Sequence, residues 1–172
     1  MTTPEGLTAI NSASRGEFVL RLGGVFEHSP WVAELAFEQR PFADVAALHA
    51  AMMACVRAAS VDAQLGLIRA HPELAGREAS AGTLTVDSTS EQGRLGFTAL
   101  TRGQLDEMAE INLRYRGRFG FPCIVALTLH QSRDTVVAEM RRRIDGDRDS
   151  EIAAALDQIG HITRVRLDKI FS

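Results

Sequence analysis

Residues 61–76 read VDAQLGLIRAHPELAG, and this stretch shows how the chain is organised. Apolar residues recur at helical spacing up to Ala70, and the pattern stops at His71-Pro72. Because the residue before a proline is pushed out of helical geometry, the stop has a steric cause. The stretch therefore predicts a helix that ends near residue 70 and a loop that begins with a histidine.

Similar start and stop signals divide the rest of the chain into helices. The segments Ser14–Glu17, Ser88–Glu91 and Thr101–Gln104 each have the spacing of a capping box. Ser29-Pro30 places a hydroxyl at an N-cap and a proline at the first helical position, and Asp44 is the expected cap of the next helix. These signals predict a succession of helices joined by mostly short loops.

Four regions fit this pattern less well. The apolar run FPCIVALTL (121–129) is consistent with either a buried strand or an extended segment. Residues 1–13 resemble a loose N-terminal arm. The longest expected loop spans residues 73–87. The pair Gly23-Gly24 lies within the pattern of the first helix and weakens it. We therefore expect an all-α fold, in which the whole chain forms a single compact domain of about seven or eight helices.

The composition excludes several classes of partner. Of the 172 residues, 45% are hydrophobic and 24% are charged, and the formal net charge is −3. Nucleic-acid-binding domains usually carry a basic surface, so we expect no nucleic-acid partner. No apolar run reaches the length of a membrane span, and neither a secretory signal nor a peroxisomal Ser-Lys-Leu ending is present. We therefore expect a cytoplasmic protein with no membrane partner.

The sequence carries no motif for a metal or a nucleotide cofactor. Its five histidines form no H-E-x-x-H motif, and Cys55 and Cys123 lack metal-type spacing. Glycine-rich phosphate-binding loops and the G-x-S-x-G motif are also absent. We therefore expect neither a bound metal nor a cofactor.

The last helical pattern contains a charged residue within its apolar face. The face consists of residues three or four positions apart: Ile152, Leu156, Ile159, Thr163, Arg166 and Ile170. At about 100° per residue, Arg166 lies only about 20° around the helix axis from Ile159, whereas Arg164 should face water. Because arginine keeps its charge, a buried Arg166 needs an anion or several hydrogen-bond acceptors. It could pair with a core carboxylate, extend its head to the surface, or bind an anionic ligand.

His71 and Glu91 each have a structural explanation and a chemical one. A histidine at a helix C-terminus interacts favourably with the helix dipole, but it also titrates most readily near neutral pH. Glu91 fits the third helical position of the Ser88 capping box. Together with a buried arginine, the two side chains would suit acid–base chemistry on an anionic small molecule. Spacing alone does not bring them together.

Six segments, in the same order along the chain, are similar to those of one known family. They are FVLRLGGVFEHSPWVAE (18–34), RPF (40–42), LIRAHPELAG (67–76), SEQGRLGF (90–97), NLRYRGRFGFP (112–122) and RVRLDKI (164–170). On these motifs the chain resembles the 2-oxo-4-hydroxy-4-carboxy-5-ureidoimidazoline (OHCU) decarboxylases of urate degradation. Single elements such as RPF would mean little, whereas six ordered matches are not expected by chance.

The resemblance implies a fold, a reaction and a set of site residues. Family members are all-α, usually homodimeric and cofactor-free, and they remove CO₂ from OHCU to form (S)-allantoin. The residues that match the family's catalytic positions are His71, Glu91 and Arg166. The residues that match its substrate-binding positions are Pro72, Ser88, Gln92, Phe121, Pro122, Cys123, Ile124 and Val125.

Three residues depart from the family pattern. Cys123 stands where an aromatic residue often follows the Phe-Pro pair, Gly93 where alanine is common, and Glu73 where aspartate is frequent. We expect these changes to alter the shape of the pocket slightly and to leave the chemistry intact.

Two other functions are compatible with the same sequence. The chain could be a non-catalytic helical domain that binds a ureide or serves as the partner of another pathway enzyme. It could also act on a related ureide by ring opening or decarboxylation. The presence of His71, Glu91 and Arg166 together favours the decarboxylase.

Overall fold

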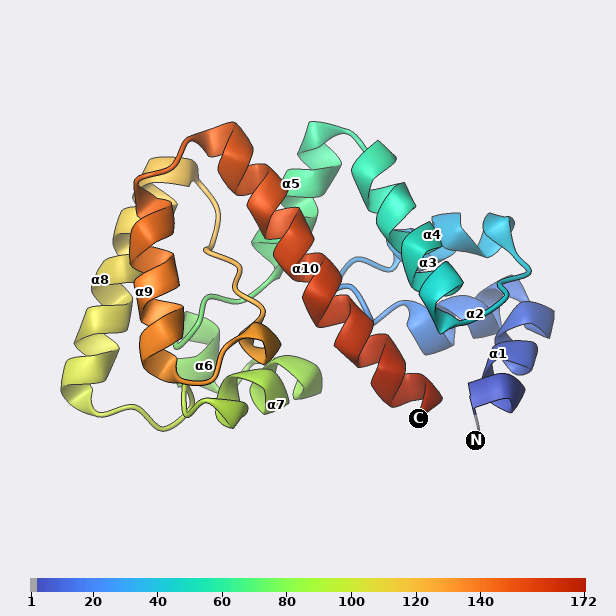
Figure 1. The fold of residues 1–172 in the computed structure, drawn as a ribbon, viewed down its shortest axis with the longest axis horizontal. Helices are drawn as coiled ribbons and strands as arrows, with labels where there is room; N and C mark the ends of the chain where they lie inside the picture. Colours follow the sequence, from blue (N-terminus) through green and yellow to red (C-terminus); the bar gives the residue numbers. More distant parts are fainter. Residues whose placement is uncertain (1–2) are drawn as a thin grey trace. The chain divides into compact units, whose positions relative to one another are not determined.

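The structure, a computed structural model that describes residues 3–172, consists of helices and connecting segments (Figure 1). The α-helices are α1 (Thr3–Ser12), α2 (Arg15–Leu22), α3 (Trp31–Ala36), α4 (Val45–Ala58), α5 (Val61–Ala70), α6 (Arg77–Ala81), α7 (Val86–Arg94), α8 (Arg102–Phe119), α9 (Arg133–Ile144) and α10 (Arg148–Phe171). The 3₁₀-helices are η1 (Phe37–Gln39) and η2 (Leu127–Leu129). Within residues 3–172 there is no strand, so the predicted all-α class is confirmed.

Internal contacts divide the chain into two compact units. Unit 1 runs to Ala70 and resumes at Thr163, and unit 2 comprises His71–Ile162. The boundary falls at the point where His71-Pro72 ends a helical pattern in the sequence. Helix α10 contributes residues to both units. That the whole chain is one domain stays a prediction.

Unit 1 is built around aromatic and aliphatic side chains from α2, α3 and α4. Phe18 is fully buried, and its ring meets the edge of Phe37 at 5.5 Å between centroids. The guanidinium of Arg40 lies 3.5 Å from the centre of the Phe37 ring and donates hydrogen bonds to the carbonyls of Asn11 and Ala13. The Arg40 guanidinium, stacked on the Phe37 ring, thus links the start of the chain to η1.

The prediction of a loose arm over residues 1–13 is wrong for the described part of that segment. Residues 3–12 form α1, in which Leu7 and Ile10 are buried. Asn11 donates from Nδ2 to the Phe42 carbonyl at 2.9 Å and accepts from the Phe42 amide at 2.8 Å. The helix is held by contacts with distant residues, which its short sequence pattern does not reveal. Met1 and Thr2 lie outside the described residues.

Several predicted helix boundaries hold and two need correction. Asp44 caps α4 by accepting from the Ala47 amide at 2.7 Å, and α5 ends at Ala70 as predicted. Helix α2 ends before Gly23, where a Cβ atom would lie 2.6 Å from the Val19 carbonyl oxygen, so the glycine ends the helix and does not continue it. Ser29 is not the N-cap of α3, because its hydroxyl donates to the Glu27 carbonyl instead.

Unit 2 is built on α8 and α9, which pack side by side (Figure 1). Gly120 ends α8 in the left-handed conformation at φ 82°, and Pro122 follows it, so the chain leaves the helix extended. The run 121–129 is therefore an extended segment that ends in η2, which decides between the two predicted alternatives. The rings of Tyr115 and Phe119 pack at 4.7 Å beside this segment's Phe121.

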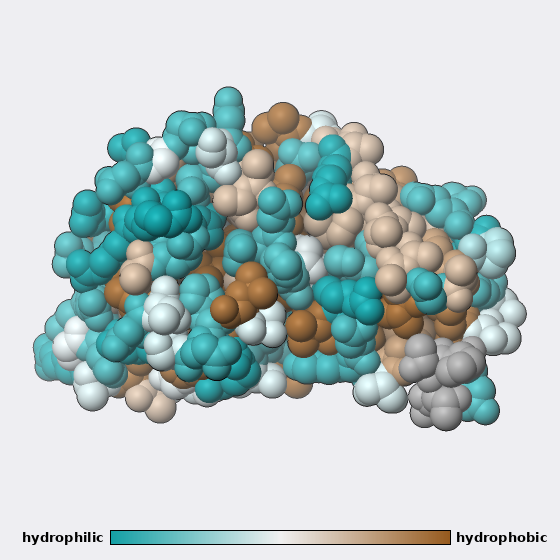
Figure 2. All heavy atoms as spheres, viewed as in Figure 1, coloured by the Kyte–Doolittle hydropathy of each residue, from teal (hydrophilic) through white to brown (hydrophobic). Residues whose placement is uncertain are grey.

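The surface of the molecule is largely polar where helices face solvent. Hydrophilic residues cover much of the visible face over α8 and α9 (Figure 2). Among the described residues, no single helix is long and apolar enough to cross a membrane. Of the helix pairs in this described part of the chain, α4 and α5 taken together reach the required length and hydropathy, and they are bent by 119° at their junction.

We expect Ile10→Ala to lower the free energy of unfolding by about 2–5 kcal/mol, because truncating a buried isoleucine loses its burial and leaves a cavity. Urea denaturation followed by circular dichroism measures the change. Leu20, which is 85% exposed on α2, is the control: Leu20→Ala should change this free energy by less than about 0.5 kcal/mol. Equal effects of the two substitutions would mean that α1 is not part of the packed core.

Candidate active site

His71 is the first residue after α5 and the first residue of unit 2. It is only 5% exposed, although it begins a loop. A charged imidazole is costly to bury, so an interaction with the helix dipole at the surface does not account for its position. Residues 71–76, which we call the His71 loop, follow directly after the helix.

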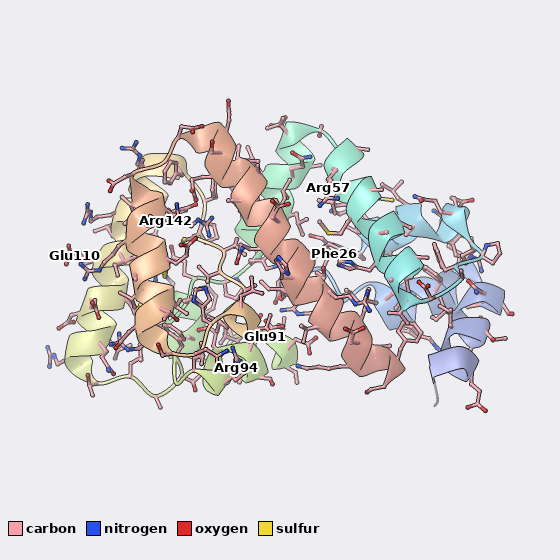
Figure 3. All side chains as sticks on the ribbon, in the orientation of Figure 1. Phe26, Arg57, Glu91, Arg94, Glu110 and Arg142 are labelled. Atoms are coloured by element: carbon pink, nitrogen blue, oxygen red, sulfur yellow. The ribbon has the colours of Figure 1, made fainter. Side chains whose placement is uncertain are left out.

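Glu91 has no capping role, which corrects the structural explanation offered by the sequence. Helix α7 begins three residues earlier than the predicted capping box, because the Thr85 hydroxyl accepts from the Ser88 amide at 3.3 Å and caps the helix. Ser88 therefore lies inside the helix and is 3% exposed. Glu91 projects from α7 near its last turn and is half-buried (Figure 3).

Helix α7 connects the His71 loop with the segment that follows α8. The side-chain carbonyl of Gln92 accepts from the Ala75 amide at 2.9 Å, and its amide group donates to the Glu73 carbonyl at 3.4 Å. Arg94, which lies two residues after Gln92 on the same helix, donates to the carbonyls of Leu127 and His130 (Figure 3). The helix that carries Glu91 is therefore bonded to the His71 loop and to residues that follow the predicted substrate-binding segment 121–125.

The predicted substrate-binding segment 121–125 is buried along its whole length. Two side chains hold its end: Arg143 donates to the Ile124 carbonyl at 2.5 Å, and Gln158 accepts from the Ala126 amide at 2.8 Å. Within the described chain, the backbone amides of residues 123–125 donate to no protein acceptor. Because buried backbone amides nearly always have a partner, this segment offers hydrogen-bond donors suited to a ligand.

A buried ionic network supports the 121–125 segment. The Arg143 guanidinium donates to the Glu151 carboxylate at 2.8 Å, and the Tyr115 hydroxyl donates to the same carboxylate. Burial raises the pKa of the Tyr115 hydroxyl above its ordinary value, so it remains a hydrogen-bond donor. Burial likewise raises the pKa of the Cys123 thiol to about 12, so the thiol stays protonated near neutral pH and is not a nucleophile.

Arg166 is buried as predicted, and it pairs with a core carboxylate. Its Nη1 donates to Glu27 Oε2 at 2.8 Å and to the Val25 carbonyl at 3.3 Å, all within unit 1. The side chains of Arg166 and Glu27 are each 2% exposed. Arg164 is 41% exposed and pairs with Asp168, as expected for the solvent-facing side of α10.

The predicted site residues therefore fall into two groups. All of them except Arg166 lie in unit 2, where α7 links the His71 loop to the end of the segment that begins with Phe121. Arg166 belongs to unit 1, where Glu27 holds it. No group of three or more histidine, cysteine or acidic side chains in the described part of the chain could hold a metal ion.

Sequence reasoning missed several polar residues that shape this site. Asn112, Arg143 and Glu151 are each at most 5% exposed. Asn112 lies one turn from Met108 on α8, and Arg143 lies three residues after Met140 on α9, so both interrupt apolar faces. The angular test that singled out Arg166 would have found them.

Comparison with known proteins identifies the family. A family model described as OHCU decarboxylase matches residues 11–168. The chain is 39% identical over 166 residues to the 2-oxo-4-hydroxy-4-carboxy-5-ureidoimidazoline decarboxylase of Haloferax volcanii, covering 96% of each chain. It is 37% identical over 161 residues to the protein of that name from Mus musculus, covering 94% of this chain and 90% of the other.

Solved structures show the same fold. The structure of (S)-allantoin synthase aligns with a TM-score of 0.73 at 28% identity, over 99% of this chain and 54% of that one. This chain therefore spans about half the length of that protein. An OHCU decarboxylase solved in the presence of (S)-allantoin aligns with a TM-score of 0.68 at 21% identity, over 92% of this chain and 99% of the other, which supports the fold.

The chain belongs to the OHCU decarboxylase family. It is a carboxy-lyase of urate degradation, and the prediction made from its motifs is confirmed at this level.

We expect Glu27→Ala to lower the free energy of unfolding by about 3–5 kcal/mol, because it leaves the buried Arg166 charge without its carboxylate. Urea denaturation measures the loss. The double variant Glu27→Leu/Arg166→Met should recover much of it, since no charge remains buried. As a control, Asp168→Ala removes the exposed partner of Arg164 and should cost less than about 1 kcal/mol. A Glu27→Ala effect as small as this control would contradict the buried pair.

Cys123 should react slowly with a thiol reagent in the folded protein. With a pKa of about 12, only about one thiol in 10⁴ is ionised at pH 8. We expect the Cys55→Ala variant, which leaves only Cys123, to be labelled at least about 10³-fold more slowly at pH 8 than the same variant unfolded in urea. Labelling should accelerate as pH rises toward the pKa. Rapid labelling of the folded variant at pH 8 would show that the thiol is accessible and ionised.

Proposed function

We propose that this chain converts OHCU to (S)-allantoin by acid–base catalysis at His71, with Glu91 and Arg166 positioning the substrate. The observation that carries the proposal is the pair of attachments made by α7. The helix that presents Glu91 is bonded to the His71 loop through Gln92 and to the segment after α8 through Arg94. Family membership supplies the substrate class.

The substrate's own ring supplies the electron sink. When the bond between the carboxylate and the hydroxyl-bearing ring carbon breaks, CO₂ leaves and the electron pair forms a C=C bond to the ring carbon that carries the ureido group. The electrons of that carbon's C=N bond move to the nitrogen, which takes up a proton. The hydroxyl then loses its proton as its carbon becomes a carbonyl, and a proton added to the ring carbon that carries the ureido group completes allantoin and creates its stereocentre. The protein therefore has to hold the ring, orient the carboxylate out of its plane and control which face receives the proton.

In this proposal, His71 handles the protons. It assists loss of CO₂ through the ring hydroxyl and delivers a proton to one face of the resulting intermediate. Glu91 orients His71 or the ureido group by hydrogen bonding. Burial of His71 supports this assignment, because proton transfer inside a site shielded from water limits delivery from the opposite face.

The remaining residues bind the ring. Backbone amides of residues 123–125, which have no acceptor in the described chain, supply donors for the polar atoms of the ring. Pro72 and Phe121 shape the apolar surface around it, and Ser88 and Gln92 complete the predicted binding set. Arg166 anchors an anionic or carbonyl oxygen, a role supported by its match to the family's last-helix motif.

A homodimer, expected from the family resemblance, and a cytoplasmic location, expected from the sequence, complete the proposal. Size-exclusion chromatography with light scattering measures the first part directly. A monomer at catalytic concentrations would remove the dimer from the proposal and leave the chemistry untouched.

Replacing His71 with asparagine should lower turnover of OHCU by about 10²–10⁴-fold, because a general acid–base group is lost while the shape of the side chain is partly kept. OHCU prepared freshly from urate decays spontaneously, so the assay follows ultraviolet absorbance together with the circular dichroism of allantoin. Wild-type protein should accelerate the decay and yield (S)-allantoin.

The same assay separates the alternatives. Unchanged OHCU decay and racemic allantoin in the presence of wild-type protein would indicate a non-catalytic ureide-binding or partner role. Near-normal turnover by His71→Asn would remove His71 from the mechanism. The double variant Glu27→Leu/Arg166→Met, which is expected to fold, should have lost turnover if Arg166 anchors the substrate. Competition by other ureides tests the breadth of the substrate class.

A further inference from the structure

Three side chains from two helices hold consecutive residues of the His71 loop. Asn112 donates from Nδ2 to the Leu74 carbonyl at 2.9 Å, and Gln92 accepts from the Ala75 amide at 2.9 Å. Arg116, one turn along α8 from Asn112, donates to the Glu73 carboxylate. Residues 73–75 are thus attached to α7 and α8 directly after His71-Pro72.

The backbone of this loop needs outside support to keep its conformation. Ala75 has a φ of 49°, a left-handed conformation that is unfavourable for a residue with a Cβ atom. At Gly76, an added Cβ would lie 2.6 Å from the Glu73 Cβ, so the turn is tightly closed. A conformation of this kind persists only where surrounding contacts determine it.

The buried position of Asn112 is energetically unfavourable. It is 5% exposed and lies on the same face of α8 as Met108, which is fully buried. Its Oδ1 is buried and accepts no hydrogen bond from any residue in the described chain. Burying an amide whose hydrogen bonds are incompletely satisfied costs free energy, so stability alone would favour an apolar residue at this position.

The carbonyl that Asn112 holds lies close to the proposed acid–base residue along the chain. Leu74 is three residues after His71, and Pro72 between them has a restricted backbone. A shift of the Leu74 peptide is therefore transmitted to His71, with little flexible chain to absorb it. Displacing a reacting group by about 1 Å can cost about 10²-fold in rate.

We propose that Asn112 is a positioning residue for the decarboxylation: its hydrogen bond to the Leu74 carbonyl fixes the His71 loop against α8. Gln92 and Arg116 fix the same loop at the two adjoining residues. The inference rests on the proposed role of His71, because Asn112 acts through that side chain. It assigns a function to a buried polar group that the proposed mechanism does not otherwise use.

The test compares Asn112→Leu with a matched control in the other unit. The chain has two asparagines, and Asn11 also bonds to a backbone carbonyl, that of Phe42 in unit 1. Asn112→Leu should reduce kcat by about 10–100-fold with a smaller change in KM, since a displaced His71 harms the reaction more than ring binding. Asn11→Leu should lower stability and leave kcat per folded molecule within about twofold.

The optical purity of allantoin distinguishes positioning from a merely structural effect. A smaller folded fraction makes less allantoin of unchanged purity, whereas a displaced His71 also delivers the proton to the wrong face. Enough protein is used that the enzymatic reaction exceeds spontaneous decay at least about tenfold in each assay. Under this condition we expect a lower excess of the (S) form from Asn112→Leu and an unchanged excess from Asn11→Leu.

A second variant keeps the proposal testable if Asn112→Leu does not fold. Arg116 is 46% exposed, so Arg116→Met should fold while releasing Glu73, and it should show the same kcat and purity effects at smaller size. A folded Asn112→Leu variant with wild-type kcat and wild-type optical purity of allantoin would overturn the proposal. If Asn112→Leu does not fold, an Arg116→Met variant with wild-type kcat and purity would overturn it. If the wild-type protein itself fails to accelerate OHCU decay, the proposed function fails, which is a distinguishable result.

Discussion

The permanent charge of arginine is the constraint on which much of this structure depends. Arg143 and Arg166 have side chains only 2% exposed, one in each unit. Neither can escape burial by losing a proton, so each requires a carboxylate, and Glu151 and Glu27 provide them. Removing one partner of a pair leaves the other as an unpaired buried charge. The helices that carry the two partners must therefore pack so that the arginine and the carboxylate meet.

The two ionic pairs differ in what they support. The pair in unit 2 also holds the Ile124 carbonyl, next to the backbone amides of residues 123–125 that donate to no acceptor among residues 3–172. The pair in unit 1 holds Arg166 itself, which stays a predicted catalytic residue from its match to the family's last-helix motif. Buried pairs of this kind are weak evidence for stability, because apolar residues of similar volume often do as well. In this protein the two pairs fix the positions of the Ile124 carbonyl and of the Arg166 side chain.

Helix α7 shows why the candidate site could be only partly predicted. The sequence identified Glu91, Ser88 and Gln92, but it placed the start of the helix at Ser88. Thr85, three residues earlier, has an equally suitable hydroxyl, and only tertiary contacts decide which of the two begins the helix. Because Ser88 is buried inside the helix, Glu91 is not the third residue of a capping box. The loose-arm prediction failed for a similar reason, because α1 is held by contacts with residues distant in sequence, such as those of Asn11 with Phe42.

The sequence by itself determined the helical class, the break at His71-Pro72, the misplaced charge of Arg166 and the family. Each of these depends on local sterics, on periodicity along one helix or on an ordered set of motifs, all of which are present in the chain before it folds. The tertiary structure alone decided that Glu27 neutralises Arg166, that segment 121–125 is extended, and that Asn112 holds the His71 loop. These contacts join residues many positions apart, and no local pattern specifies which distant partner a buried polar group will meet.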